Sequence, residues 1–199
     1  MIRSMIRLGV ILALFAGLAC AGLAVVYSIT GPVIAQQQQK DLEAALKAIF
    51  PDSDGFSDIT PELAGPDPKI TIRNGYVMKK GGSTIGAAVK AIGPSYSAGA
   101  VVLTGIGTDG KVVRAVILEL NDTPGLGANA ANPNYFVDKP NKITFMGQFA
   151  GKSLGDPFTA KGDVQAITAS TITTQSIAAI VKASGAAAKA YLDTTGGAK

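Results

Sequence analysis

Residues 101–120 read VVLTGIGTDGKVVRAVILEL and point directly to a β-hairpin. Two apolar runs rich in β-branched residues flank Asp109-Gly110, a dipeptide that favours a tight turn because glycine accepts a positive φ at little cost. Similar short runs precede this hairpin at 69–73, 75–79 and 85–92. We therefore predict antiparallel strands that form a small sheet.

Downstream of these strands, the sequence changes to a helical period. Ile177, Ile180 and Val181 fall on one face of residues 173–192, and lysines fall on the other side. This spacing predicts a carboxy-terminal helix. Gly185 weakens the middle of that helix by about 1 kcal/mol relative to alanine, so the helix could be split there.

A shorter helical pattern lies upstream of the strands, over residues 41–50. Pro51 ends it, because proline cannot continue a helix. The prolines and aspartates between 55 and 68 indicate a loop. The predicted fold class is α+β: a small antiparallel sheet with flanking helices.

The hairpin also contains a misleading motif. Residues 105–110, GIGTDG, match the dinucleotide pattern G-x-G-x-x-G. That pattern must open a helix after a strand, whereas here the glycines lead to Val112, Val113 and another strand-like run. We interpret the motif as a hairpin turn.

The amino-terminal segment is long enough to cross a bilayer. Residues 8–30 carry no charge, and a helix of this length covers about 34 Å, whereas a hydrocarbon core is about 30 Å thick. A cleaved signal peptide, with small residues at 19–22, is the alternative. The apolar run exceeds the usual length of a signal peptide's apolar region, which favours a retained anchor closed by Gly31-Pro32.

The cations near this span predict its orientation. Arg3 and Arg7 precede it, and the next cation is Lys40, so the positive-inside rule places the amino terminus in the cytoplasm and the rest outside. We expect a single-pass protein of the inner, or cytoplasmic, membrane. The predicted organisation is a cytoplasmic terminus at 1–7, a transmembrane helix at 8–30, a stalk and short helix at 31–54, and an exported domain at 55–199.

Composition excludes several classes of function. The 199 residues include no histidine, which removes the commonest general base and metal ligand, and the single cysteine, Cys20, lies within the span. The exported part is therefore expected to have neither a disulfide nor a thiolate metal site. The net charge is +4, but the lysines and arginines are scattered, so we do not expect nucleic-acid binding.

Two polar segments are candidates for a site. Residues 122–127, DTPGLG, follow the second strand of the hairpin, and their proline and glycines allow backbone amides to approach a flat ligand. Residues 165–171, QAITAST, are small and hydroxylated and lead into the predicted carboxy-terminal helix. Each alone is also compatible with a simple turn or with helix capping.

Together the two segments resemble the FMN-binding domain of the RnfG family, which is shared with NqrC of the sodium-pumping quinone reductase. The family pattern is a loop E-T-P-G-L-G followed by D-x-x-[ST]-G-A-T at a helix start. The resemblance covers nearly the whole chain, including residues 93–99. It implies one amino-terminal span and an exported flavin domain.

Carried over position by position, the family's flavinylated threonine falls on Thr171. The resemblance then implies FMN bound covalently by a phosphodiester at Thr171, with further cofactor contacts from Thr168, Ala169, Ser170, Asp122, Thr123, Pro124, Gly125, Leu126 and Gly127. The chain departs from the family at Gln165, where the motif has aspartate, and at Asp122, where it has glutamate. Asp163 would substitute for the missing aspartate only with a shift of register.

The resemblance also implies a role and partners. The chain would transfer electrons, without catalysis of its own, among other membrane subunits of an Rnf complex that couples ferredoxin:NAD oxidoreduction to transport of Na⁺ or H⁺. A threonine hydroxyl needs a base to become a nucleophile, so a flavin transferase is implied as a further partner. The alternatives are an NqrC-like subunit, a flavin-free anchored scaffold, or an exported enzyme that uses Asp109, Glu119 and Asp122.

Overall fold

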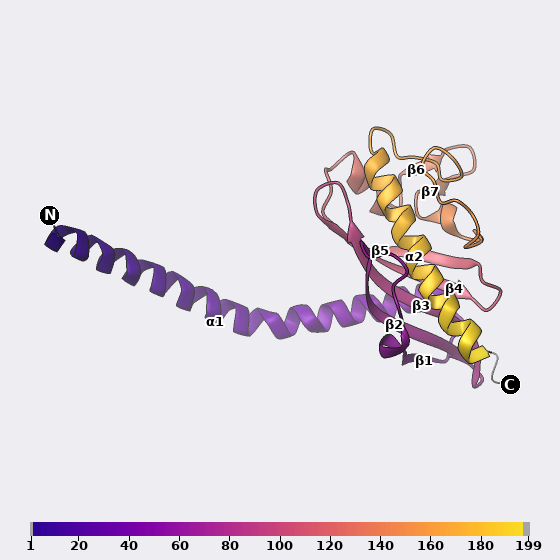
Figure 1. The fold of residues 1–199 in the computed structure, drawn as a ribbon, viewed down its shortest axis with the longest axis horizontal. Coiled ribbons are helices and arrows are strands. Elements are labelled where there is room, and N and C mark those ends of the chain that lie inside the picture. Colours follow the sequence, from indigo (N-terminus) through magenta and orange to yellow (C-terminus); the bar gives the residue numbers. More distant parts are fainter. Residues whose placement is uncertain (1, 197–199) are drawn as a thin grey trace. The chain divides into compact units, whose positions relative to one another are not determined.

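The structure is a computed structural model that describes residues 2–196, and it divides into two compact units, Met1–Glu43 and Ala44–Lys199. The first unit is formed by most of α1 (Ile2–Ile49), the one helix in the described chain that is long and apolar enough to cross a membrane (Figure 1). Within it, the hydroxyls of Ser28 and Thr30 donate to backbone carbonyls three and four residues earlier. These polar groups are therefore satisfied inside the helix, as a bilayer requires.

The expected end of this helix at Gly31-Pro32 is wrong. Helix α1 continues through Pro32 to Ile49, so the segment predicted at 8–30 and all but the last residue of the segment predicted at 41–50 belong to one helix. Proline removes a single backbone hydrogen bond, and an otherwise favourable sequence can continue past it. Side-chain bonds from the glutamine run support this continuation, since Gln37 and Gln39 donate to carboxylates four residues later, at 2.8 and 2.9 Å.

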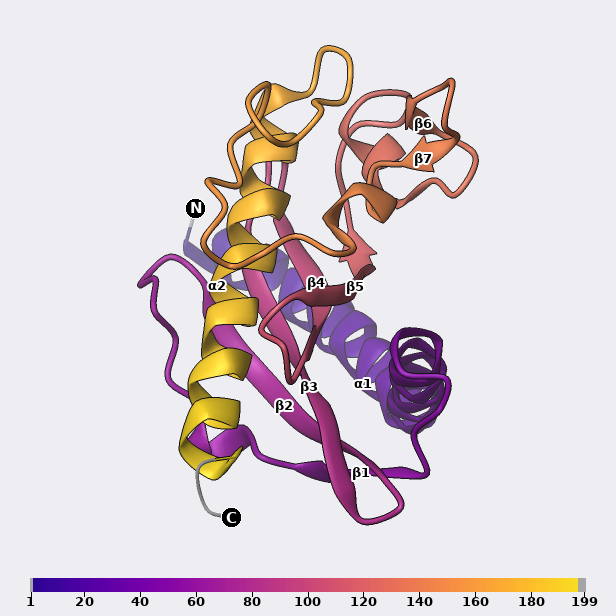
Figure 2. The same ribbon diagram turned by 90° about the vertical axis from the view of Figure 1, so that its right-hand side faces the viewer.

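The second unit contains a five-stranded antiparallel sheet, which confirms the α+β prediction (Figure 2). The strands pair in sequence order: β1 (Gly55–Asp58), β2 (Thr71–Lys80), β3 (Ser83–Pro94), β4 (Gly99–Gly107) and β5 (Val112–Leu120). The predicted hairpin joins β4 to β5, and Gly110 has the expected positive φ of 75°.

Two strand predictions need correction. Residues 69–73 and 75–79 do not form separate strands: most of both lie in β2, which passes Asn74-Gly75 with a register shift between Ile72 and Asn74 instead of turning. Strand β1 lies within the predicted loop 55–68. All four of its residues are exposed, so it carries no apolar alternation by which a strand could be recognised.

Helix α2 (Thr171–Gly196) covers one face of the sheet, over β3 and β4 (Figures 1 and 2). It begins two residues before the predicted start and is not split at Gly185. A Cβ at Gly185 would lie 2.6 Å from Leu154 and 3.1 Å from Ile106, so glycine here permits close packing of the helix on the sheet. The predicted apolar face is buried, with Ile177, Ile180 and Val181 fully enclosed.

The last turns of α1 belong to this second unit. Leu46, Ile49 and Phe50 are buried at 1, 2 and 6% exposure. Phe50 lies against the backbone of Gly86 and Gly105, where added Cβ atoms would lie 2.7 and 2.9 Å from its ring. The buried residues Ala45, Leu46, Ile49 and Phe50 are therefore part of the core of the second unit, together with the strands that carry these glycines.

The segment between β5 and α2 has little regular structure. It contains the 3₁₀ helices η2 (Gly127–Ala131) and η3 (Gly147–Phe149) and a second sheet of β6 (Phe136–Asp138) and β7 (Ile143–Thr144). Three buried phenylalanines stabilise this segment. The Phe149 ring contacts Phe145 edge-to-face, with 5.5 Å between the ring centroids, and stacks on Phe158, with 6.1 Å between the centroids. This segment leads the chain to the start of α2.

Candidate functional site

The two motifs predicted from the sequence meet at a pocket of about 400 Å³. The loop after β5 contributes Asp122, Thr123, Leu126 and Gly127, the start of α2 and the preceding turn contribute residues 169–173, and the turn between β3 and β4 adds Tyr96. Pockets of about 300–1,000 Å³ are typical of small-molecule and cofactor sites. Pro124, Gly125 and Thr168 belong to the same two segments but do not line the pocket.

Asp122 joins the three segments that form the pocket. The residue is 7% exposed, and its carboxylate accepts hydrogen bonds from the hydroxyls of Thr173 and Ser95 at 2.5 and 2.7 Å, and from the amide of Ser97 at 3.0 Å. Burial raises the pKa of Asp122, but these bonds and one from the amide of Tyr96 outweigh it and lower the pKa below 3.8. Asp122 is therefore a buried anion that connects helix, loop and turn.

The glycines of the loop allow close packing beside this carboxylate. Gly125 has a φ of 77°, a conformation that other residues rarely adopt. A Cβ at Gly127 would lie 2.6 Å from both an Asp122 oxygen and the Thr173 hydroxyl, so only glycine fits without displacement. Leu126, between them, is 40% exposed at the pocket.

Thr171 is the first residue of α2, and its side chain is exposed at the pocket. The next residue, Ile172, is 59% exposed, whereas Ser170 and Thr173 are buried. The first amides of a helix lack intrahelical partners and favour an anion by about 0.3–1 kcal/mol. A hydroxyl here is therefore accessible and lies where a phosphate would be stabilised.

Ala169 adopts the left-handed conformation, with a φ of 57°. This is the position where the family motif has glycine, which accepts such a φ without steric cost. For alanine, the conformation costs roughly 1–2 kcal/mol. The turn before Thr171 is therefore strained in this chain.

We expect Ala169→Gly to raise the free energy of unfolding by up to about 1 kcal/mol. Relief of the left-handed strain is partly offset by the greater entropy of glycine in the unfolded chain. Ala186→Gly, within α2, is the matched control and should lower stability by about 1 kcal/mol. Denaturant titration measures both, and a destabilised Ala169→Gly would contradict the interpretation.

Gln165 and Asp163 have separate roles in the segment before the helix. The side chain of Gln165 is exposed. Asp163 accepts bonds from the Lys152 ammonium at 2.8 Å and from the amides of Phe158 and Thr159 at 3.1 and 2.7 Å. Asp163 is therefore engaged in holding the loop and is not available to take the place of the motif aspartate.

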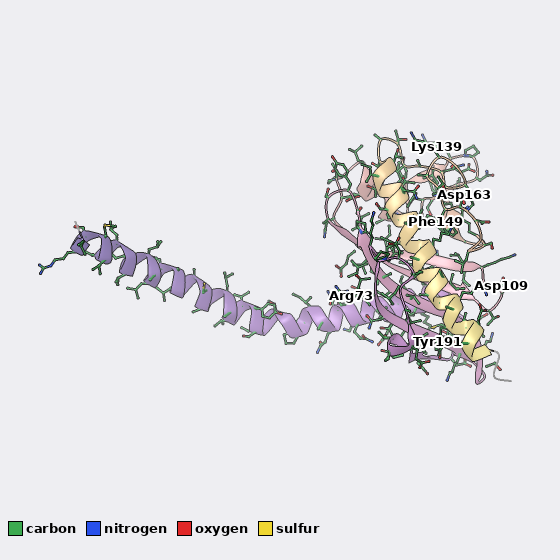
Figure 3. The ribbon with its side chains drawn as sticks, viewed as in Figure 1. Arg73, Asp109, Lys139, Phe149, Asp163 and Tyr191 are labelled. Carbon is green, nitrogen blue, oxygen red and sulfur yellow. The ribbon has the colours of Figure 1, made fainter. Side chains whose placement is uncertain are left out.

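This network shifts the acid–base behaviour of Asp163 strongly. Burial raises the pKa of the carboxyl, but the bonds from Lys152, Thr159 and Phe158 and the charge of Lys152 outweigh it and lower the pKa from 3.8 to about 2. Figure 3 labels Asp163 and Phe149 in the part of the domain where α2 begins, and Tyr191 near the other end of the helix.

Because the folded-state pKa is depressed, Asp163 contributes stability above about pH 4, and this is lost as the pH falls toward about 2. We expect a loss of about 1–2 kcal/mol, since partial exposure screens the ion pair. Unfolding of the wild type and of Asp163→Asn at pH 6 and pH 2 tests this. The difference between the two proteins should shrink at pH 2, and a gap that is independent of pH would contradict it.

The carboxylates of the alternative enzyme hypothesis do not form one site. Asp109 lies in the hairpin turn, where it accepts a bond from the amide of Lys111 at 3.1 Å, whereas Asp122 follows the opposite end of β5. Glu119 is exposed. General acid–base chemistry needs groups in one defined geometry, so this arrangement does not favour that hypothesis.

Several residues of the site were not predicted from the sequence. Ser95, Ser97 and Thr173 bond Asp122, while Gln148 and Tyr135 contact the backbone before Thr171. The first two lie in the segment 93–99 that contributed to the family resemblance. No sequence motif marks Gln148 or Tyr135, because their partners are backbone groups that lie far away in the sequence.

Two protein-family models match parts of this chain. Residues 1–49 match the RnfG N-terminal region, and residues 96–185 match the FMN-binding domain. The second match includes both motifs, the turn before β4 from Tyr96 onward, and the first half of α2. The fold and site thus define a protein with an FMN-binding domain that follows an amino-terminal apolar helix.

Curated relatives specify the class further. The chain is 32% identical, over 80% of its length and 78% of the relative, to the G subunit of the proton-translocating ferredoxin:NAD(+) oxidoreductase complex of Clostridium ljungdahlii. It is 29% identical to the Na(+)-translocating counterpart of Acetobacterium woodii, over 86% of this chain and 85% of the relative. It is 31% identical to the G subunit of the ion-translocating oxidoreductase complex of Shewanella baltica, over 89% of this chain and 86% of the relative. The chain belongs to this family of G subunits, the RnfG family.

Proposed function

We propose that the chain is the electron-transfer subunit that carries FMN in a membrane complex coupling ferredoxin:NAD oxidoreduction to translocation of Na⁺ or H⁺. The names of the relatives include both ions, and the FMN-binding domain supports a flavin carrier. The match of residues 1–49 to the RnfG N-terminal region favours this complex over the NqrC alternative. Other Rnf subunits are the expected partners.

The observation that carries the proposal is the exposed hydroxyl of Thr171 at the helix start inside the pocket. We propose that a flavin transferase attaches FMN there. A bond forms between the Thr171 oxygen and the FMN phosphorus of FAD, the pyrophosphate bond breaks, and AMP leaves. The chain has no histidine, so the transferase supplies the base that takes the hydroxyl proton.

The residues present fit this group. Ala169 and Ser170 are small, and the unpaired amides at the start of α2 suit a phosphodiester. Tyr96, Leu126 and Ile172 line the pocket with exposed apolar surface that a flat ring would cover. When bound, FMN supplies the redox chemistry, and the protein's part is to hold and orient it.

The apolar part of α1 supports a single-pass membrane protein. We propose that the amino terminus lies in the cytoplasm, since Arg3 and Arg7 precede the span. The flavin domain then lies on the periplasmic or extracellular side. A covalent tether suits this location, because a freely dissociating cofactor is lost wherever its concentration falls below its dissociation constant.

The test is to express the full chain with and without the transferase and to examine the denatured protein. We expect a flavin-fluorescent band and a mass increase of one FMN only with the transferase, and a fragment containing residues 165–175 that carries the added mass. Unmodified protein in the presence of active transferase would support the flavin-free scaffold instead. Modification of another fragment would contradict the assignment to Thr171.

The departure at Gln165 gives a second prediction. We expect Gln165→Asp, which restores the family motif, to raise the initial rate of flavinylation several-fold. Because the Gln165 side chain is exposed, the free energy of unfolding should change by less than about 0.5 kcal/mol. Mass spectrometry over a time course measures the rate, and an unchanged rate would show that the transferase does not use this position.

A further inference from the structure

The backbone before Thr171 is held by side chains from a distant part of the sequence. These side chains belong to the segment from η2 to η3, which contains the small β6–β7 sheet. Gln148 contacts the backbone at Gln165, and Tyr135 contacts it at Thr168. The two contacts lie at the start and the middle of the 165–171 run.

Gln148 pairs with Gln165 as a neighbouring strand would. Its side-chain oxygen accepts from the Gln165 amide at 2.7 Å, and its nitrogen donates to the Gln165 carbonyl at 3.2 Å and to the Phe145 carbonyl at 3.0 Å. Gln148 is itself well positioned, because it lies in η3 beside Phe149, which is buried with Phe145. The side-chain amide of Gln148 is therefore held toward Gln165 by an element that is packed into the core.

Tyr135 makes a second contact. Its hydroxyl oxygen accepts from the Thr168 amide at 3.3 Å. Between these two points, the Ile167 amide donates to the hydroxyl of Thr174 on α2 at 3.1 Å. Three amides of the run are thus bonded to side chains rather than to a neighbouring backbone segment.

We propose that Gln148 and Tyr135 are positioning residues that hold residues 165–170 in the conformation in which the transferase meets Thr171. This inference rests on the proposed flavinylation of Thr171. The strained φ of Ala169 persists only where the surrounding contacts fix it, and these are such contacts. Gln165 and Thr168 are exposed, so water can replace the lost bonds, and the effect is on local order more than on global stability.

The test uses the purified full chain without FMN, together with transferase and FAD, and measures the initial rate of FMN transfer. We expect Gln148→Ala to slow transfer about five- to tenfold and Tyr135→Phe to slow it about two- to threefold, as the loss of neutral hydrogen bonds implies. Gln148→Glu, which keeps the acceptor for the Gln165 amide, should restore part of the rate.

Matched controls remove equivalent groups elsewhere. Gln175 makes the same kind of paired contact with another part of the chain. Its side-chain oxygen accepts from the Ala160 amide at 2.9 Å, and its side-chain nitrogen donates to the Phe158 carbonyl at 3.2 Å. Gln175→Ala and Tyr191→Phe, near the far end of α2, should leave the transfer rate within about twofold of wild type. Amide hydrogen exchange should rise at Gln165 in Gln148→Ala and at Thr168 in Tyr135→Phe, with the unfolding midpoint unchanged.

Wild-type rates in both Gln148→Ala and Tyr135→Phe would overturn the inference, as would equal slowing by Gln175→Ala. A lower unfolding midpoint that accounts for the slower transfer would also overturn it, because the role would then be structural. If the wild type itself accepts no FMN at Thr171, the proposed function fails. In that case, amide exchange at Gln165 and Thr168 still tests whether Gln148 and Tyr135 hold this backbone.

Discussion

Thr171→Ala is expected to abolish covalent FMN completely while leaving the fold intact. The substitution removes the one oxygen that would form the phosphodiester, and the Thr171 side chain is exposed, so little packing is lost. Thr171→Ser keeps the hydroxyl and should still be modified. Flavin fluorescence of the denatured band and intact mass, after expression with the transferase, measure both outcomes.

The control for this experiment is Thr194→Ala, which removes an exposed threonine hydroxyl from the last turns of the same helix. It should carry as much FMN as the wild type. Covalent flavin on Thr171→Ala would show that another residue is the acceptor. Equal loss of flavin in Thr194→Ala would mean that modification depends on the helix as a whole.

Phe50→Ala is expected to cause the largest loss of stability, about 3–5 kcal/mol, which is typical for a buried phenylalanine. The ring is 6% exposed and fills the space above Gly86 and Gly105, so its removal leaves a cavity that backbone cannot close. Unfolding of the full chain in detergent, followed by circular dichroism, measures the change.

Phe56→Ala is the matched control, because Phe56 is 42% exposed on β1. It should cost less than half as much as Phe50→Ala. A cost for Phe50→Ala as small as that for Phe56→Ala would show that Phe50 does not contribute to the core. The prediction also implies that a soluble version of the domain should begin at or before residue 44 and not at 55.

The sequence predicted those elements whose own residues determine them. The hairpin at Asp109-Gly110 and the helix around Ile177 follow from local turn chemistry and apolar periodicity, and both are confirmed. Strand β1 and the small β6–β7 sheet have neither signal, because they depend on pairing and on three phenylalanines that meet only in the folded chain. The continuation of α1 past Pro32 depends on favourable neighbours that outweigh one lost bond.

The site shows the same division. The resemblance identified the two motifs, and the structure places both at one pocket. Sequence spacing could not show that Asp122 bonds Ser95 and Thr173, which lie 27 and 51 residues away. Nor could it show that Ala169 has a left-handed φ, since alanine itself gives no indication of one.

The length and burial of α2 have a consequence for electron exchange. Thr171 lies at the tip of a 26-residue helix whose middle is locked into the sheet, and sites on such elements are held more precisely than sites on loops. A cofactor attached at Thr171, as proposed, would therefore be anchored to a support that does not bend. The distance that an electron crosses would then be set by how the redox partners approach the domain, and not by movement of α2.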